Sequence, residues 1–332
     1  MKKSDVVKAI LQEKYLQAPR FTEASAFAPT NIALCKYWGK RNTELNLPVT
    51  SSLSIALGQK GARVHFEIID RDQDHIVLNQ AVVASSQGFA QRLTQFLNLF
   101  RGDAGPHFSI QIESDIPIAA GLASSACGFA SLVMTLNALY GWDLTAQDLS
   151  ILARLGSGSA SRSLWQGFVE WHAGSRVDGM DSYSEPMSAQ WQDLRIGLWI
   201  MNQQEKPISS RAAMLRTVET SPLYAAWPGK VAKDLQRLKH AIQTQDFTLL
   251  GETAESNALN MHATMLSAWP PITYAIPETL IAMQTVWRLR AEGLPLYFTQ
   301  DAGPNLKLLF LQKESAAVIA AFPEVDVVTV FA

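Results

Sequence analysis

The chain contains 332 residues, of which 48% are hydrophobic and 17% are charged, and its formal net charge is −2. This composition excludes an intrinsically disordered chain and is typical of one large or two medium globular domains. Because lysine and arginine are not in excess, it does not favour nucleic acid or an anionic membrane as a partner.

The N-terminal segment and the cysteines indicate the compartment. Asp5 and Glu13 interrupt the apolar positions near the N-terminus, so we expect no signal peptide. The sequence lacks the run of about 18 apolar residues that a transmembrane helix requires. Cys35 and Cys127 are far apart, so the pattern predicts neither a disulfide framework nor a cysteine-based zinc site. We therefore expect a cytoplasmic protein.

The first part of the chain is predicted to contain short strands and amphipathic helices. Residues 4–17 have the period of a surface helix, and residues 21–34 that of a strand pair around Pro29. Further strands are predicted at 53–57, 62–69, 75–79, 108–113 and 167–172, and helices at 86–100, 126–140 and 145–155, the last with Thr145 as its N-cap. A long polar loop, 174–192, follows, and we place there the boundary between an N-terminal domain, 1–190, and a C-terminal domain, 191–332.

The second part is predicted to be richer in helices. Helices are expected to open at 207–211 and to cover 223–243, 246–267, 277–292 and 306–312, with strands at 194–201, 294–299 and 327–331. The alternation of strands and helices, with much local strand pairing, predicts an α+β fold and not a doubly wound parallel sheet.

The segment Pro117-Ile118-Ala119-Ala120-Gly121-Leu122-Ala123-Ser124-Ser125-Ala126 joins a predicted strand to a predicted helix. Its glycine allows a ligand to approach the backbone, its serines supply hydroxyls, and the helix N-terminus supplies unpaired N–H groups. These features predict a phosphate-binding loop, although an ordinary capped helix after a turn has a similar pattern. The loop is not a Walker A motif, because no Gly-Lys-Ser/Thr follows it.

Three further clusters combine cations with hydroxyls. Lys36, Lys40 and Arg41 lie within six positions and are interleaved with Tyr37, which indicates an anion pocket in place of a solvated turn. The segment 156–163 lies between apolar stretches, so it indicates a buried oxyanion site that ends in Arg162 and not a flexible linker. The third cluster, at 209–211, is a serine pair followed by an arginine.

Asp301 begins a tight glycine turn, 301–305, at the end of a predicted strand. This place suits a catalytic base, although an aspartate before a turn is more often a cap. The histidine spacing does not match a protein-built zinc site, and the sequence has no Gly-x-Ser-x-Gly motif of a hydrolase.

Together these blocks resemble the diphosphomevalonate decarboxylase family of the GHMP kinase superfamily. The resemblance is carried, in order, by residues 28–42 with 45–48 and 51–52, by the loop 117–126, by 156–163 and by 301–305. It implies a two-lobed GHMP kinase fold, with a ribosomal protein S5 domain 2-like N-terminal lobe and a ferredoxin-like C-terminal lobe. It also implies an ATP- and Mg²⁺-dependent homodimer that decarboxylates mevalonate 5-diphosphate to isopentenyl diphosphate in isoprenoid biosynthesis.

The resemblance gives roles to individual residues. Asp301 resembles the carboxylate that orients and deprotonates the tertiary hydroxyl of the substrate, and Lys36 resembles its cationic neighbour. Arg162 and Asn31 resemble the groups around the substrate carboxylate. The implied diphosphate pocket consists of Tyr37, Lys40, Ser157, Ser159, Ser210 and Arg211. The implied ATP site consists of Pro117, Gly121, Leu122, Ala123, Ser124 and Ser125, with Ser124 nearest to a magnesium ion that ATP oxygens mainly hold.

Two positions depart from the family pattern. Ala213 stands where the family often has glycine, and Gln300 stands before Asp301 where we expect an apolar residue. Two alternatives remain: a related GHMP enzyme that acts on mevalonate or a mevalonate monophosphate, including a kinase that does not decarboxylate, and a non-enzymatic nucleotide-binding member. The presence of Lys36, Arg162 and Asp301 together favours the decarboxylase.

Overall fold

The structure is a computed structural model that describes residues 1–102, 105–115, 124–204 and 206–331, with Ser124 described only as the first residue of a helix. Its helices are α1 (Lys3–Leu11), α2 (Gly88–Arg101), α3 (Ser124–Tyr140), α4 (Ala146–Gly156), α5 (Ser210–Thr220), α6 (Trp227–Thr244), α7 (Phe247–Leu266), α8 (Pro277–Ala291) and α9 (Ser315–Ala321). Its strands are β1 (Glu23–Cys35), β2 (Lys40–Asn42), β3 (Leu47–Pro48), β4 (Ser52–Ile69), β5 (His75–Leu78), β6 (Ala81–Val83), β7 (His107–Ser114), β8 (Phe168–Trp171), β9 (Ser184–Pro186), β10 (Leu194–Trp199), β11 (Tyr297–Gln300), β12 (Leu306–Leu311) and β13 (Asp326–Thr329). Short 3-10 turns lie at η1 (Gln12–Lys14), η2 (Gly158–Arg162), η3 (Tyr224–Ala226) and η4 (Gln312–Glu314).

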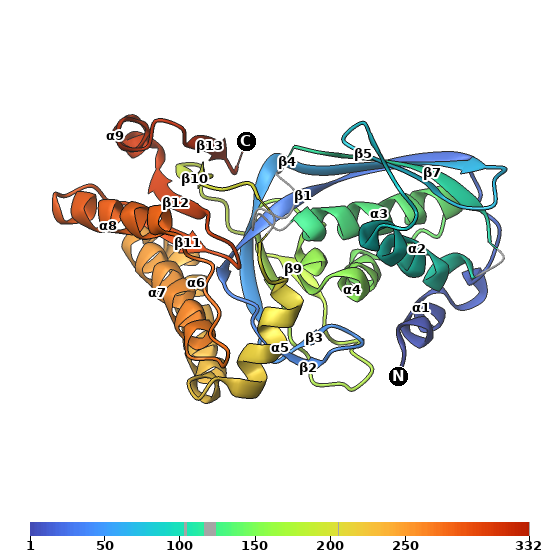
Figure 1. The fold of residues 1–332 in the computed structure, drawn as a ribbon, viewed down its shortest axis with the longest axis horizontal. Coiled ribbons are helices and arrows are strands. Elements are labelled where there is room, and N and C mark those ends of the chain that lie inside the picture. The colour runs from blue at the N-terminus through green and yellow to red at the C-terminus, as the bar shows by residue number, and fades with distance from the viewer. Residues whose placement is uncertain (103–104, 116–123, 205, 332) are drawn as a thin grey trace.

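The larger sheet is built around the long strand β4. Its order is β6-β5-β7-β4-β8-β9, and β1 also pairs antiparallel with β4 along most of its length. Residues 62–69 of β4 pair with β7, whereas residues 52–55 pair with β8, so one strand links the two ends of the sheet. Helices α2, α3 and α4 lie together under this sheet (Figure 1).

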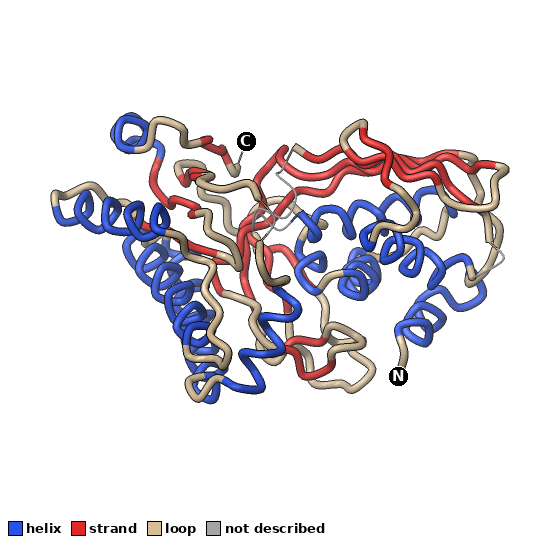
Figure 2. Tube along the Cα trace, in the orientation of Figure 1, coloured by secondary structure: helices blue, strands red, loops and turns tan. Residues whose placement is uncertain are grey.

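The smaller sheet has the order β11-β12-β10-β13, and each of its strand pairs is antiparallel. Helices α6, α7 and α8 form the helical layer of this half (Figure 2). Along the chain, the last strand of the larger sheet ends at Pro186, and the first strand of the smaller sheet begins at Leu194. We therefore propose a division into two domains at residue 190.

One hydrophobic core crosses between the two halves. Ile32 and Leu34 of β1 and Leu53 of β4 pack in the same buried cluster as Val231 of α6 and Leu250 of α7. The C-terminal end of β1 is therefore held against the C-terminal half. This packing places the residues that follow β1 beside the end of β11.

Several local predictions are confirmed. Thr145 accepts a hydrogen bond from Asp148 N at 3.1 Å and caps α4. The segment 156–163 is largely buried, as its apolar flanks predicted. In the described part of the chain, no helix is long and apolar enough to cross a membrane.

Four predictions of elements are wrong. The segment 21–34, predicted as a strand pair, contains the single strand β1, in which a register shift after Pro29 accommodates the missing N–H. The strands 53–57 and 62–69 are likewise parts of one strand, β4, and the loop 174–192 contains β9. Residues 306–312 were predicted as a helix, but 306–311 form the strand β12. This leucine-rich segment is buried between two neighbouring strands, and tertiary pairing overrides its helix propensity.

Candidate active site

The centre of the candidate site is a carboxylate between two buried lysines. Lys36 follows β1, and its Nζ donates to Asp301 Oδ1 at 2.6 Å and to the Ala33 carbonyl oxygen at 2.8 Å. Lys307 of β12 places its Nζ 3.2 Å from Asp301 Oδ2. The side chains of Lys36 and Lys307 are 2% and 0% exposed, whereas that of Asp301 is 21% exposed. The carboxylate is therefore the member of this group that a ligand can reach.

The turn that carries Asp301 is fixed from several sides. Gly303 N donates to the Asp301 carbonyl oxygen at 2.8 Å, and Gln300 Nε2 donates to the Gly303 carbonyl oxygen at 2.9 Å. His262 Nε2 donates to the Asp301 carbonyl oxygen at 3.2 Å. Gln300, which departs from the expected pattern, thus stabilises the turn through its amide.

The two lysines determine the charge of Asp301. Burial alone would raise the pKa of this carboxyl, but the positive charges of Lys36 and Lys307 outweigh that effect and hold its pKa well below the usual value. Burial lowers the pKa of Lys36, and Asp301 offsets part of this decrease. Asp301 is consequently ionised at neutral pH.

A second buried cation lies beside this group. Arg162 ends η2, is 2% exposed, and donates from Nε and Nη2 to Asn31 Oδ1 at 3.3 Å each. Asn31 is itself oriented by its bond from Nδ2 to Ser163 Oγ at 2.7 Å. Burial lowers the pKa of Arg162 to about 10, and Asp301 and Tyr37 offset part of this decrease. Arg162 therefore remains positively charged at neutral pH and has no carboxylate within ion-pair distance among the described residues.

The start of η2 lies against Tyr37. Ser157 Oγ lies 3.2 Å from Ser159 Oγ, and a Cβ atom at Gly158 would come within 2.9 Å of the Tyr37 hydroxyl. The Tyr37 hydroxyl is buried and has no hydrogen-bond partner within the described part of the protein. Such an unsatisfied buried donor is costly unless a ligand accepts its hydrogen bond.

The remaining predicted cations come from β2 and α5. Lys40 Nζ donates to Asn46 Oδ1 at 2.7 Å, and Asn46 is buried. Burial, Arg211 and Lys3, in that order, lower the pKa of Lys40 to about 8. Ser210 Oγ accepts from Lys206 Nζ at 2.7 Å, and Lys206 also donates to the Ala302 carbonyl oxygen at 3.1 Å. Lys206 thus ties the start of α5 to the turn of Asp301.

We expect kcat/KM for an anionic substrate to fall as pH rises through about 8, because Lys40 must be protonated to bind an anion and its pKa in the free protein is about 8. In Lys40→Arg the charge persists, so this basic limb should move to higher pH. A pH profile of kcat/KM from 6 to about 10 tests this. A limb that stays in place in the variant would assign the titration to another group.

The predicted ATP site is only partly visible. Pro117, Gly121, Leu122 and Ala123 lie outside the described residues, as does the side chain of Ser124. Ser125, in the first turn of α3, has its Oγ 3.4 Å from Ser157 Oγ. The helix that follows the predicted phosphate loop therefore begins next to η2.

The sequence did not reveal three residues of this site. Lys307 and His262 contact Asp301, and Lys206 contacts its neighbour Ala302. A lysine inside the apolar segment 306–311 was a signal, because a buried lysine requires an anionic partner. The erroneous helix prediction for this segment concealed it. Burial lowers the pKa of His262 to about 4, so this imidazole is neutral at pH 7.

Comparison with known proteins identifies the class and then the family. The chain matches the diphosphomevalonate decarboxylase-like N-terminal domain over residues 28–184 and the mevalonate 5-diphosphate decarboxylase C-terminal domain over residues 196–328. The diphosphomevalonate decarboxylase of Aspergillus fumigatus is 37% identical over 320 residues, which cover 89% of this chain and 78% of that protein.

Two solved structures are closely similar. One is mevalonate diphosphate decarboxylase from Staphylococcus aureus, with a TM-score of 0.87, 37% identity, and coverage of 94% of this chain and 96% of that chain. The other is MDDEF in complex with MVAPP, AMPPCP and magnesium, with a TM-score of 0.86, 40% identity, and coverage of 93% and 96%. The fold is therefore the two-lobed α+β fold of the GHMP kinase superfamily. Within that superfamily, the chain belongs to the diphosphomevalonate decarboxylase family.

Proposed function

We propose that this protein catalyses the ATP-dependent decarboxylation of mevalonate 5-diphosphate to isopentenyl diphosphate, with release of ADP, phosphate and carbon dioxide. The observation that carries the proposal is the Asp301 carboxylate between two buried lysines, next to the buried cation of Arg162. Oδ1 accepts from Lys36, and Oδ2 is buried 3.2 Å from Lys307 Nζ. Because the Asp301 side chain as a whole is 21% exposed, a substrate hydroxyl can still approach this carboxylate.

The proposed chemistry needs a carboxylate and several cations. Phosphorylation of the tertiary hydroxyl produces a leaving group, and its departure leaves positive charge on that carbon. The neighbouring substrate carboxylate then releases carbon dioxide, and its electron pair forms the new double bond. Arg162 is placed to hold that carboxylate until this step, since its fork-shaped guanidinium matches carboxylate geometry.

The charge of Asp301 defines its part in the first step. Because Lys36 and Lys307 lower its pKa, Asp301 stays ionised and accepts the hydrogen bond of the hydroxyl, but it is a weak base. Phosphoryl transfer passes through a loose transition state in which positioning matters more than early deprotonation. We therefore assign to Asp301 first the orientation of the hydroxyl and then the acceptance of its proton.

The residues present suit ATP and magnesium. Ser125 at the start of α3 and Ser157, which precedes η2, have hydroxyls 3.4 Å apart, and Lys206 supplies an ammonium group beside the turn of Asp301. Bound ATP with magnesium supplies the phosphoryl group that is transferred, and magnesium is held mainly by phosphate oxygens in such sites. The likeness to MDDEF, whose complex contains AMPPCP and magnesium, supports this assignment.

The decisive test offers the protein ATP and magnesium with mevalonate, its 5-phosphate or its 5-diphosphate. ADP and carbon dioxide are measured separately. The proposal requires ADP and carbon dioxide in equal amounts from the 5-diphosphate. Formation of ADP without carbon dioxide would instead identify a kinase of the same superfamily.

We expect kcat/KM for the 5-diphosphate to exceed that for the 5-monophosphate by about two orders of magnitude, because each charge-assisted hydrogen bond contributes about 1.5–3 kcal/mol. Lys40, Arg211 and Tyr37 supply more donors than one phosphate group can use. Steady-state kinetics with both substrates test this. Equal values would mean that these residues do not bind the second phosphate.

We also propose that the protein is a cytosolic homodimer, as the family resemblance implies. Cys35 and Cys127 are buried and form no disulfide within the described part of the chain, which is compatible with a reducing compartment. Sedimentation equilibrium should give twice the chain mass of 36.5 kDa. A mass of 36.5 kDa at micromolar concentration would overturn the dimer.

A further inference from the structure

Helix α1 is packed against the hairpin that carries Lys40. Val6, Val7 and Leu11 of α1 are at most 1% exposed, and they belong to the same buried cluster as Leu45 and Leu47 of the β2–β3 hairpin. The helix is therefore an integral part of the N-terminal half and not a loose extension. Figure 1 shows α1 beneath α2, with the N-terminus of the chain on the side of β2 and β3.

The first residue of α1 is fastened to the same hairpin. Lys3 N donates to Glu44 Oε1 at 3.3 Å, and Lys2 N donates to Asp5 Oδ2 at 2.8 Å. These two N–H groups are thus already satisfied by carboxylates. Lys3 therefore lies at the end of α1 that is bound to the hairpin, and this residue is only partly exposed.

Lys3 and Lys40 are bound to neighbouring residues of one hairpin, because Lys3 N donates to Glu44 and Lys40 Nζ donates to Asn46 at 2.7 Å. Burial lowers the pKa of Lys3, Glu44 opposes this effect, and the charge of Arg211 adds to it. Lys3 in turn contributes, after burial and Arg211, to the lowered pKa of Lys40. Three cations from α1, β2 and α5 therefore repel one another across this pocket, with Glu44 as the carboxylate that acts on Lys3.

Mutual repulsion among neighbouring cations is relieved when an anion binds between them. The Tyr37 hydroxyl lacks a hydrogen-bond partner within the described part of the protein. Burial raises the pKa of Tyr37, and the positive charge of Arg211 is one of those that oppose this increase. The same surroundings thus contain an unsatisfied donor and a concentration of positive charge, which is the pattern of an anion site.

We propose that Lys3 is a third cation of the diphosphate pocket, so that helix α1 forms part of the substrate site. The family match begins at residue 28, so this residue lies outside it. The inference rests on the proposed function for the identity of the ligand, but its electrostatic basis applies to any diphosphate. Lys3 binds and positions the terminal phosphate and takes no part in proton transfer or carbon–carbon cleavage.

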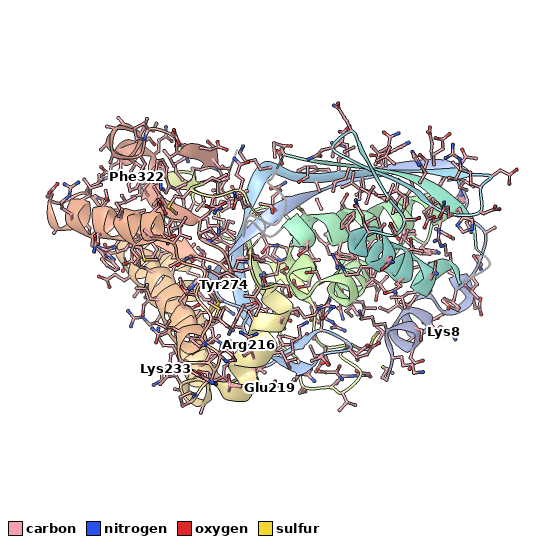
Figure 3. All side chains as sticks on the ribbon, viewed as in Figure 1. Lys8, Arg216, Glu219, Lys233, Tyr274 and Phe322 are labelled. Atoms are coloured by element: carbon pink, nitrogen blue, oxygen red, sulfur yellow. The ribbon has the colours of Figure 1, made fainter. Side chains whose placement is uncertain are left out.

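The test compares Lys3→Gln with the matched variant Lys8→Gln in the full-length protein. Lys8 is on the same helix, is exposed, and lies over the Tyr15 ring at 5.4 Å. Figure 3 shows it at the outer edge of the molecule, away from α5. Both changes remove one positive charge from α1, so a difference between the variants reports position and not net charge.

For Lys3→Gln we expect KM for mevalonate 5-diphosphate to rise about three- to tenfold, because the variant loses one partly exposed ion pair to a phosphate. The values of kcat and of KM for ATP should not change. The basic limb of kcat/KM should also move to higher pH, because removal of Lys3 relieves repulsion on Lys40. Lys8→Gln should match the unchanged protein in both measurements. Equal behaviour of the two variants would overturn the proposal.

Binding of inorganic diphosphate, measured by calorimetry, separates this inference from the proposed function. Weaker binding to Lys3→Gln than to Lys8→Gln supports the cation site even if the protein does not decarboxylate. Equal affinity of inorganic diphosphate for the two variants contradicts the site even if decarboxylation is observed.

Discussion

Replacement of Asp301 by asparagine is expected to lower the rates of ADP formation and of carbon dioxide release together, by about two to four orders of magnitude. The amide keeps the shape of the carboxylate but cannot accept the hydroxyl proton, and it presents a weaker acceptor to orient that hydroxyl. Because phosphorylation precedes the loss of carbon dioxide, both products should decrease in parallel. Single-turnover assays of each product measure this.

Asp301→Asn also leaves Lys36 and Lys307 without their shared counter-charge. Some loss of stability is therefore expected, since an uncompensated buried charge is destabilising, and a thermal melt must accompany the kinetics. Asp326→Asn is a suitable control, because Asp326 pairs with Lys60 at 2.7 Å but is 47% exposed. Rapid ADP formation without carbon dioxide in Asp301→Asn would assign the residue to the second step.

Arg162→Gln is expected to lower kcat/KM for mevalonate 5-diphosphate by about two orders of magnitude or more, because the variant loses a buried, charge-assisted pair with the substrate carboxylate. Glutamine removes the charge and the fork but can still donate one hydrogen bond toward Asn31. The affinity for ATP should change much less, because the nucleotide contacts proposed here begin at α3. Steady-state kinetics and nucleotide titration separate the two effects.

The surroundings of Arg162 provide the control. Arg162 also contacts Ser52, so its loss removes a structural hydrogen bond as well as a ligand contact. Ser52→Ala removes that structural contact and leaves the cation in place. If Ser52→Ala lowers kcat/KM as much as Arg162→Gln does, the arginine acts through packing and not through the substrate.

Predictions from local sequence succeeded where the interaction itself is local. The cap at Thr145 needs only Asp148, three residues away, and similar side-chain caps begin α5 at Ser209 and α7 at Asp246. Helix positions could therefore be predicted within a few residues. The order of the family blocks also indicated the fold and the family, which the comparisons confirm.

Predictions failed where neighbours distant in the chain decide the conformation. The segment 306–311 has good helix formers, yet it pairs with β10 and β11 and becomes a strand. Pro29 suggested a break between two strands, whereas pairing with β4 continues past it through a register shift. In both cases hydrogen bonds to other strands outweigh local propensity.

Motifs in the sequence were enough to identify the chemical groups of the site: the carboxylate of Asp301, the cations of Lys36, Lys40 and Arg162, and the hydroxyls between them. That Lys307 faces Asp301 from the next strand, and that Lys3 lies beside the hairpin of Lys40, became visible only in the folded chain. The physical reason is that these are charge interactions between residues far apart in the chain. Their strength depends on burial and separation, and the packing of two sheets and their helices fixes both.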